Sequence, residues 1–323
     1  MPLPRIAVLA LGGTIAGSAS TATDATAYRA ATTGIDALLA AVPELARVAD
    51  LTGEQFAQID SSDLTDELLL ALSRRVSELA QTVDGIVITH GTDTLEESAY
   101  FLHLTVRSST PIVLVGAMRP ATSLSADGPR NLYGGVVAAA SVSARGQGVL
   151  VVMNDEIHSA RDVTKTSTLR LDAFRSPHGP LGAIVDGKAV FYRSVSRVHT
   201  AATEFDLPDA MPTSAIVYAH SGLDAALIDS LTGYDVIVHA GFGNGTVSAR
   251  IVDALERQRA RGAVIVRASR TDGALTRVGA SDQRANEWLV VDDQNPERAR
   301  LLASLALART SDHADLQEMF YRY

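Results

Sequence analysis

The chain has 323 residues, of which 46% are hydrophobic, and its 28 Lys and Arg against 37 Asp and Glu give a net charge of −9. This composition excludes a disordered or collagen-like chain, and the length corresponds to about two domains of roughly 150 residues. A pI of about 5.4 argues against a nucleic-acid partner and against an anionic membrane surface, since both select basic proteins. The absence of cysteine excludes disulfides, thiolate zinc sites and a cysteine nucleophile.

The sequence predicts no membrane-spanning segment, because no apolar run reaches about 18 residues. The apolar run that begins at Ile6 is too short for the core of a signal peptide and fits a buried strand better. We therefore expect a cytoplasmic protein, or else the processed form of a periplasmic or secreted one.

Short runs rich in Val and Ile alternate with helical patterns along most of the chain. Strands are expected at residues 6–11, 85–89, 112–116, 149–153, 214–219, 236–240 and 263–267. Helices are expected at residues 64–80, 95–104, 131–143, 223–231, 247–261 and 296–308. Most of the strand runs are apolar on both faces, which is typical of parallel strands covered by helices. The alternation predicts an α/β fold with a doubly wound, mostly parallel sheet.

Residues 188–212 interrupt this alternation with short alternating pieces and two prolines. We interpret residues 189–212 as a linker with a strand or two. It separates a larger N-terminal domain, residues 1–188, from a smaller C-terminal α/β domain, residues 213–323. Residues 18–33 are rich in Ala, Thr and Ser without an apolar period, so we expect a mobile loop of the kind that covers an active site.

Polar residues follow the carboxyl ends of the first predicted strands, where sites form in open α/β sheets. Thr14 follows Gly12 and Gly13, Thr92 and Asp93 follow the second strand, and Lys165 follows the fourth. The glycine-rich loops at 12–17 and 241–246 lack the G-x-G-x-x-G spacing, so the sequence does not predict nucleotide binding. No zinc or calcium spacing is present, and we expect neither a metal nor another cofactor.

A threonine hydroxyl is a weak nucleophile and needs a base. Lys165 is one of only two lysines, and an amine, unlike a guanidinium group, can lose its proton when it is desolvated. Thr92, Lys165 and Asp93 could form a relay with the logic of a Ser-His-Asp triad. The structural alternative is that Thr14 caps a turn, that Asp93 supports one, and that the scarcity of lysine reflects codon use.

The helix expected at 95–104 begins with a capping-box pattern, Thr94-x-x-Glu97, which makes Thr94 the predicted N-cap. Thr92 and Asp93 then lie at the positive end of that helix, which favours a developing oxyanion. His90 and His158 flank the polar motifs, and we expect both to be structural hydrogen-bonding residues.

The motifs Leu-Gly-Gly-Thr14-Ile-Ala-Gly and His90-Gly-Thr92-Asp93-Thr-Leu-Glu-Glu resemble the two active-site signatures of bacterial-type L-asparaginases. The resemblance continues through residues 116–122, 125–133, 154–168, 174–182 and the tail 305–323, and is nearest to the type II enzymes, which include glutaminase-asparaginases. It implies hydrolysis of the side-chain amide of L-asparagine to L-aspartate and ammonia without a cofactor, with lesser L-glutaminase activity.

The same resemblance implies the catalytic residues. Thr14 would attack the amide carbon and form an acyl-enzyme. Tyr28, in the loop after the first strand, would contact Thr14. Thr92, Asp93 and Lys165 would form a second triad, and which triad supplies the base stays open at this point.

It also implies the substrate contacts. Ser61 would bind the α-carboxylate of the substrate. Ser62 falls where many type II enzymes carry Gln, so recognition of the α-amino group would differ here. The backbone carbonyl of Ala117 would receive the leaving nitrogen, and Asn244 would reach the site of a neighbouring subunit.

Relatives of this kind are tetramers with 222 symmetry, so the resemblance implies a homotetramer. An acid from a neighbouring subunit often completes the site, but residues 278–287 align poorly with that part of the family pattern. Asp282, Glu287 or a serine could take this role.

Three alternatives to a selective asparaginase stay open. One is a glutaminase-asparaginase with comparable use of both substrates, since one methylene is worth only about 1–3 kcal/mol of discrimination. The others are an amidase subunit of a tRNA-dependent amidotransferase, and a sensor that binds an amino acid without turnover.

Overall fold

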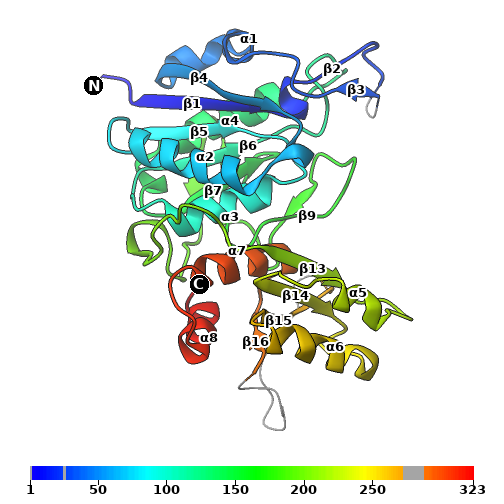
Figure 1. Cartoon of the computed structure of the whole chain (residues 1–323). Helices are drawn as coiled ribbons and strands as arrows, with labels where there is room; N and C mark the ends of the chain where they lie inside the picture. Colours follow the sequence, from blue (N-terminus) through cyan, green and yellow to red (C-terminus); the bar gives the residue numbers. More distant parts are fainter. Residues whose placement is uncertain (1, 25–26, 272–286) are drawn as a thin grey trace. The chain divides into compact units, whose positions relative to one another are not determined.

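The computed structural model of the chain describes residues 2–24, 27–271 and 287–323. It divides into two compact units, Met1–Thr203 and Glu204–Tyr323, and each contains a sheet with helices on both faces (Figure 1). None of the helices within the described ranges combines the length and the apolar character that crossing a bilayer requires. The predicted two-domain α/β fold with a mostly parallel sheet is confirmed.

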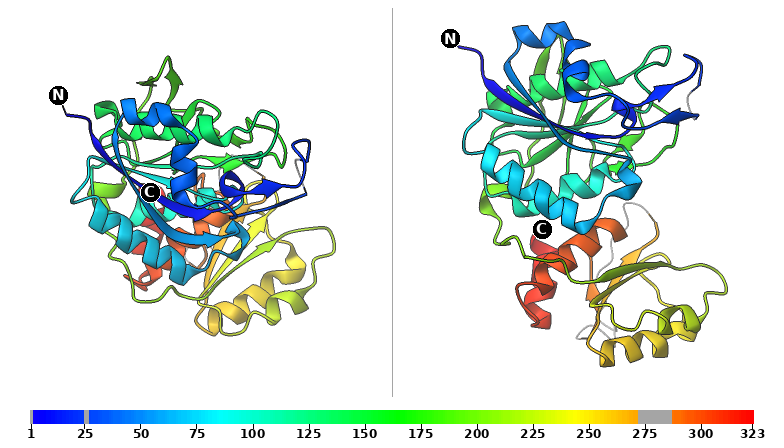
Figure 2. Two further views of the ribbon diagram at one scale, coloured as in Figure 1. Left: turned by 90° about the horizontal axis from the view of Figure 1, so that it is seen from above. Right: turned by 45° about the horizontal axis from the view of Figure 1, so that its top comes forward.

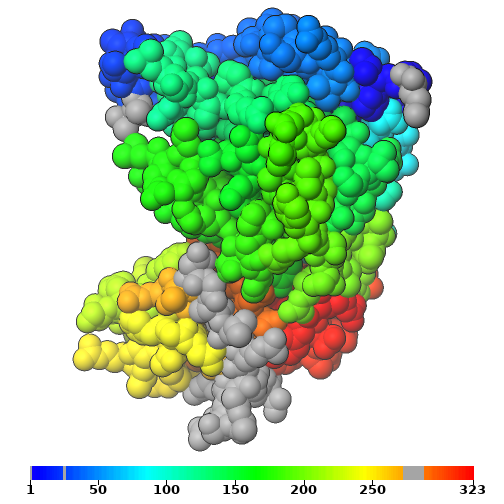
Figure 3. Space-filling view, turned by 180° about the vertical axis from the view of Figure 1, so that it is seen from behind, coloured from blue at the N-terminus to red at the C-terminus, as the bar shows by residue number. Residues whose placement is uncertain are grey.

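The first unit is built on an eight-stranded sheet with the strand order β12-β11-β8-β7-β6-β5-β1-β4. Five neighbouring strands of this sheet run parallel: β4 (Asp50–Ile59), β1 (Arg5–Gly12), β5 (Gly85–Thr89), β6 (Ile112–Val115) and β7 (Val149–Met153). Three antiparallel strands extend it: β8 (Glu156–Ser159), β11 (Gly182–Val185) and β12 (Lys188–Phe191). The green segment that holds these three strands covers much of the back of this unit (Figure 3).

Two hydrophobic cores lie on the two faces of the sheet because successive strand residues point to opposite sides. On one face, Val8 and Val87 pack with α1 (Ile35–Ala40) and α4 (Gly128–Ala139). On the other, Leu9 and Ile88 pack with α2 (Asp66–Leu79) and α3 (Leu95–Thr105). The result is the three-layer arrangement of Figures 1 and 2.

The sequence patterns did not place the two edge strands of this sheet. Strand β4 lies at the sheet edge and alternates between exposed and half-buried residues, so it has no apolar run to detect. Strand β12 lies at the opposite edge, inside the segment expected to be a linker. The first unit therefore continues past residue 188 as far as Thr203.

The expected loop at residues 18–33 contains a short hairpin, β2 (Ser18–Ala19) and β3 (Tyr28–Arg29). Backbone and side-chain bonds tie it to the segment after β6: the Thr122 hydroxyl accepts from the Ala19 amide at 2.9 Å, and the Ala22 carbonyl accepts from the Leu124 amide at 2.9 Å. This hairpin places Tyr28 beside the end of β1.

The second unit contains a parallel sheet of four strands in chain order: β13 (Ser214–Tyr218), β14 (Val236–Gly241), β15 (Val264–Ser269) and β16 (Leu289–Val290). Helices α5 (Ala225–Asp229) and α6 (Ala249–Ala260) supply Ile228, Ile251 and Leu255 to the core on one face. Helix α7 (Pro296–Leu307) packs on β13, β14 and β15, and α8 (His313–Arg322) packs on α7 and β16.

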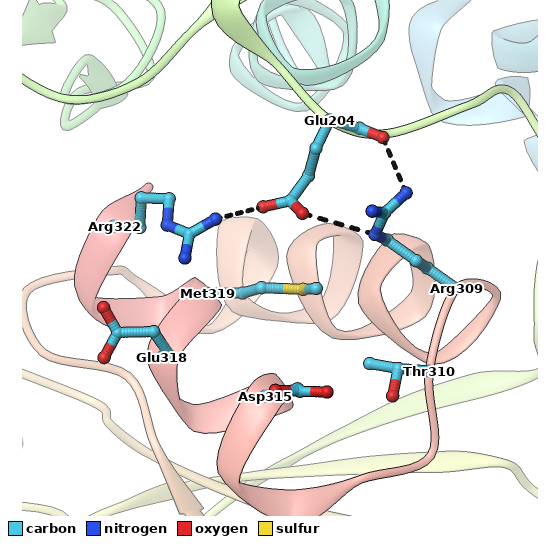
Figure 4. A pocket seen from close by; sticks show the side chains of 7 residues that line it. All are labelled: Glu204, Arg309, Thr310, Asp315, Glu318, Met319 and Arg322. Atoms are coloured by element: carbon cyan, nitrogen blue, oxygen red, sulfur yellow. Dashed lines mark hydrogen bonds and ion pairs between the residues drawn. The ribbon is translucent and has the colours of Figure 1, made fainter.

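The first residue of this unit is fastened to its C-terminal helices. The Glu204 carboxylate pairs with Arg322 at 2.6 Å and with Arg309 at 3.3 Å, and all three residues line a polar cavity of about 460 Å³ (Figure 4). The Glu204 amide also donates to the Tyr323 hydroxyl at 3.0 Å. These bonds hold both ends of the second unit together.

His239 lies in the middle of β14 with no exposed surface, between Val217 and Arg267 on the neighbouring strands, and neither ring nitrogen has a hydrogen-bond partner among the described residues. Burial, and secondarily the charge of Arg267, lower the pKa of His239 to about 4. Between about pH 6.5 and 4 the unfolded chain therefore binds a proton that the folded chain does not, so stability is lost as the pH falls through this range.

His239→Leu should relieve this acid sensitivity. From pH 7.5 down to pH 5, His239 should cost the wild type about 2 kcal/mol of unfolding free energy, and the variant should not show this loss. Urea unfolding followed by the fluorescence of Trp288, the only tryptophan and a buried residue of this unit, measures the difference. His220→Leu, at an exposed histidine of the same unit, controls for the loss of a histidine as such. Parallel stability curves of the wild type and His239→Leu would refute the assignment.

Candidate active site

The site is built where three loops meet at the carboxyl ends of β4, β1 and β5. Strand β1 lies between β4 and β5, so the chain leaves β1 toward one neighbour and returns on its other side, which is the switch point where α/β sheets form sites. A Cβ atom on Gly13 would lie 2.2 Å from the Cα atom of Gly91, and one on Gly91 would lie 2.5 Å from the Ser61 hydroxyl. Gly13 also has a φ of 76°. Only glycine allows these loops to approach so closely.

Thr14 begins a short 3₁₀ helix directly after this contact and is 7% exposed. Its hydroxyl lies 2.6 Å from the Tyr28 hydroxyl, and either group can be the donor. Gly17 leaves room for the tyrosine ring, because a Cβ atom there would lie 3.1 Å from the ring carbon Cδ2 of Tyr28. The structure thus brings together the first two residues expected in the site.

Thr92, Asp93 and Lys165 form a second hydrogen-bonded group. The Lys165 ammonium donates to the Thr92 hydroxyl at 2.8 Å and to the Asp93 carboxylate at 2.6 Å. The Lys165 side chain is 17% exposed and that of Asp93 63% exposed, so the ion pair is buried at one end only. In this arrangement the amine is a donor to Thr92 and must release a proton before it can accept one.

Glu96 was not among the expected site residues. Its buried carboxylate accepts a bond from the backbone amide of Lys165 at 2.6 Å, in addition to its place in the first turn of α3. The available signal was a glutamate on the helix face that is otherwise apolar, four residues after Thr92.

Thr94 is the N-cap of α3, as its position in the capping box predicts, but its side chain makes no capping bond. The hydroxyl instead donates to the backbone carbonyl of Ser61 at 2.8 Å. Thr94 therefore joins the loop after β5 to the loop after β4, a tertiary bond that the local pattern could not reveal.

The expected substrate-binding residues of the first unit surround the same strand ends. Ser61 is buried and faces Gly91, whereas Ser62 is exposed and bonds through both its amide and its hydroxyl to Asp60 at 3.1 Å. Ala117 is fully buried and follows β6.

The expected residues of the second unit lie apart from one another in the chain. Asn244 is exposed in the tight turn closed by the Phe242–Thr246 bridge after β14. Glu287 lies 3.6 Å from the Arg259 guanidinium. Asp282 lies outside the described residues.

The histidines near the site are neutral hydrogen-bonding groups. His90 is buried between the Gly91 carbonyl, 2.7 Å from Nδ1, and the Ser98 hydroxyl, 2.8 Å from Nε2. Burial lowers the pKa of His90 to about 4, and burial does the same for His158. Neither ring is positively charged at neutral pH, and the carbonyl partner fixes the Nδ1 proton of His90, so the Nε2 atom of His90 is the acceptor toward the Ser98 hydroxyl.

Gly91→Ala should strongly reduce activity, because the new methyl group would have to displace Ser61 and separate the loops that carry Thr14 and Thr92. We expect a stability loss of about 1–3 kcal/mol from overpacking and a fall in kcat/KM of about 100-fold or more. Gly34→Ala is the matched control, since its nearest neighbour would lie 3.7 Å away and its φ of −79° suits alanine. Steady-state kinetics and thermal unfolding test the pair, and a fully active Gly91→Ala enzyme would contradict the close-approach argument.

Comparison with known proteins agrees with this geometry. The family described as "Asparaginase, N-terminal" matches residues 5–197, and "Glutaminase/Asparaginase C-terminal domain" matches residues 215–320. The chain is 46% identical to the glutaminase-asparaginase of Pseudomonas fluorescens biotype A, over 99% of this chain and 91% of that protein. It is 44% identical to L-asparaginase 2 of Escherichia coli, over 100% and 94%.

A solved structure leads to the same assignment. The crystal structure of a probable cytoplasmic L-asparaginase from Campylobacter jejuni matches with a TM-score of 0.95 and 44% identity, over 99% of this chain and 100% of that one. The resemblance drawn from the sequence motifs is confirmed: the chain belongs to the asparaginase family.

Proposed function

We propose that this protein hydrolyses the side-chain amide of L-asparagine to L-aspartate and ammonia, with lesser activity toward L-glutamine. The observation that carries the proposal is the pairing of two threonine hydroxyls at one sheet edge with two different proton partners, Tyr28 for Thr14 and Lys165 for Thr92. The names of the relatives support the choice of substrate.

In the proposed reaction the Thr14 oxygen attacks the amide carbon and its proton passes either to Tyr28, which is hydrogen-bonded to Thr14, or to the Thr92–Lys165 pair, which has no hydrogen bond to Thr14 in the described structure. The C–N bond then breaks, the nitrogen takes up a proton and leaves as ammonia beside the Ala117 carbonyl, and an acyl-Thr14 ester remains. Water cleaves this ester to aspartate and restores the Thr14 hydroxyl. Ser61 holds the α-carboxylate, and Asp93 offers a negative charge for the α-ammonium group.

The proposal includes a homotetramer in which Asn244 and an acid of a neighbouring subunit complete each site. Ser62 stands where many type II enzymes carry the longer Gln, so the contact with the α-amino group of the substrate differs. We also place the protein in the cytoplasm, a reducing compartment that suits a chain without cysteine. Light scattering tests the assembly, and a fully active monomer would exclude a shared site.

Thr14→Ala and Lys165→Met should each lower kcat for ammonia release by about 100-fold or more while the fold is retained, since one removes the nucleophile and the other a proton-transfer partner. Lys188→Met is the matched control because Lys188 is the only other lysine and is exposed at the sheet edge. Coupled ammonia assays and circular dichroism provide the readouts. Unchanged activity in Lys165→Met would remove Lys165 from the mechanism.

L-Glutamine should be hydrolysed with a kcat/KM roughly 10- to 200-fold below that for L-asparagine, because the substrates differ by one methylene and share both charged groups. Parallel progress curves with both amides measure this ratio. Equal values would favour a glutaminase-asparaginase with comparable use of both substrates. Tight aspartate binding without ammonia release from either amide would favour a sensor instead.

A further inference from the structure

The segment after β6 is held by two side chains that the reaction does not otherwise use. Asp127 is the N-cap residue of α4, and Asn131 lies in that helix's first turn. They are 9% and 2% exposed. Together they bind the backbone of the segment that carries Ala117 at three of its polar groups, namely the Gly116 carbonyl, the Met118 amide and the Arg119 amide.

The Asp127 carboxylate accepts from the Met118 amide at 2.9 Å with one oxygen and from the Arg119 amide at 2.9 Å with the other. The Asn131 side-chain amide donates to the Gly116 carbonyl at 3.0 Å and to Asp127 at 3.1 Å. Asp127 thus receives three N–H donors, which offsets the cost of burying its charge.

Asn131 also joins two strand ends. Its side-chain oxygen accepts from the backbone amide of Asn154 at 3.0 Å, in the turn between β7 and β8. One side chain therefore fixes the end of β6 relative to the end of β7. By contrast, among the described residues the Gly116 amide bonds only to the sulfur of Met153, at 3.2 Å, which is a weak acceptor. The geometry of the segment thus depends largely on Asp127 and Asn131.

Asp127 and Asn131 bind peptide groups on both sides of Ala117 but do not bind the Ala117 carbonyl itself. Within the described part of the chain, no residue donates a hydrogen bond to the Ala117 carbonyl oxygen. The Ala117 carbonyl is therefore buried and has no donor among these residues, while side chains fix the neighbouring peptide groups. Such a carbonyl is preorganised to accept an N–H from a ligand.

We propose that Asp127 and Asn131 are positioning residues that fix the direction of the Ala117 carbonyl, so that it accepts an N–H of the substrate's side-chain amide. This inference rests on the proposed function. It deepens that proposal by assigning selectivity for an amide, as opposed to an ester or an acid, to a buried pair that does not touch the substrate.

The isosteric variants Asp127→Asn and Asn131→Asp test the pair. Asp127→Asn turns an acceptor toward a backbone N–H into a donor, and Asn131→Asp sets a carboxylate oxygen against the Gly116 carbonyl. The double exchange, Asp127→Asn with Asn131→Asp, restores the total charge but not the backbone bonds, so it should not rescue either variant. Arg130→Gln is the control, since Arg130 is exposed on the same helix, where it pairs with Asp155 and lies over the Tyr133 ring, and it binds neither Gly116, Met118 nor Arg119.

Three measurements separate positioning from general damage: kcat/KM for L-asparagine, kcat/KM for the β-methyl ester of L-aspartate, and the Kd of L-aspartate. The ester and the acid present no N–H to the Ala117 carbonyl. Each single variant should lose about 10- to 100-fold in kcat/KM for the amide, with the Kd of L-aspartate changed by less than about threefold. The ratio of amide to ester kcat/KM should fall accordingly.

Equal losses for the amide and for L-aspartate binding would overturn the proposal, because they would mean that the whole site is damaged. Unchanged amide hydrolysis in Asn131→Asp would also overturn it, and this variant suffices if Asp127→Asn does not fold. A wild-type protein that releases no ammonia at all would instead refute the proposed function, whatever the variants do.

Discussion

The site depends on one backbone contact, the approach of Gly13 to Gly91 at the switch point of the sheet. Cβ atoms at these two positions would lie 2.2 Å from the Gly91 Cα atom and 2.5 Å from the Ser61 hydroxyl, so larger residues are excluded. Because parallel strands β1 and β5 end at the same edge, this contact places the residue after each glycine, Thr14 and Thr92, in one small region. The two hydroxyls then acquire different partners from different parts of the chain.

These partners come from segments that are distant in sequence and are fixed by bonds outside the chemistry. Tyr28 reaches Thr14 from a hairpin that is tied to residues 121–124. Lys165 reaches Thr92 with its backbone held by the buried Glu96. The reacting groups are therefore supported by a surrounding set of satisfied polar groups, which is the arrangement that precise catalytic geometry requires.

The sequence predicted most of the buried parallel strands and the helices between them because their apolar runs report burial on both faces, whereas the two-residue β16 is too short to form such a run. It missed β4 and did not place β12 within the expected linker, because edge positions leave no such run. It also could not locate the hydroxyl of Thr94, which bonds to Ser61 across two loops. The sequence could predict Thr14, Thr92 and Lys165 as site residues, because they follow predicted strands and because Lys165 is one of only two lysines. Asp127 and Asn131 act through backbone amides and carbonyls, and such tertiary bonds have no local sequence signal. Glu96 also acts through a backbone amide, and its only signal was a carboxylate on an otherwise apolar helix face.

The proposed mechanism requires that Thr14, and not Thr92, attacks the substrate. A crystal structure of Lys165→Met soaked with L-asparagine tests this requirement most directly, since we expect this variant to bind the amide but not to turn it over. The amide carbon should lie within about 3–3.5 Å of the Thr14 hydroxyl oxygen, with the amide nitrogen toward the Ala117 carbonyl. An amide carbon nearer to Thr92, or one out of reach of both threonines, would contradict it.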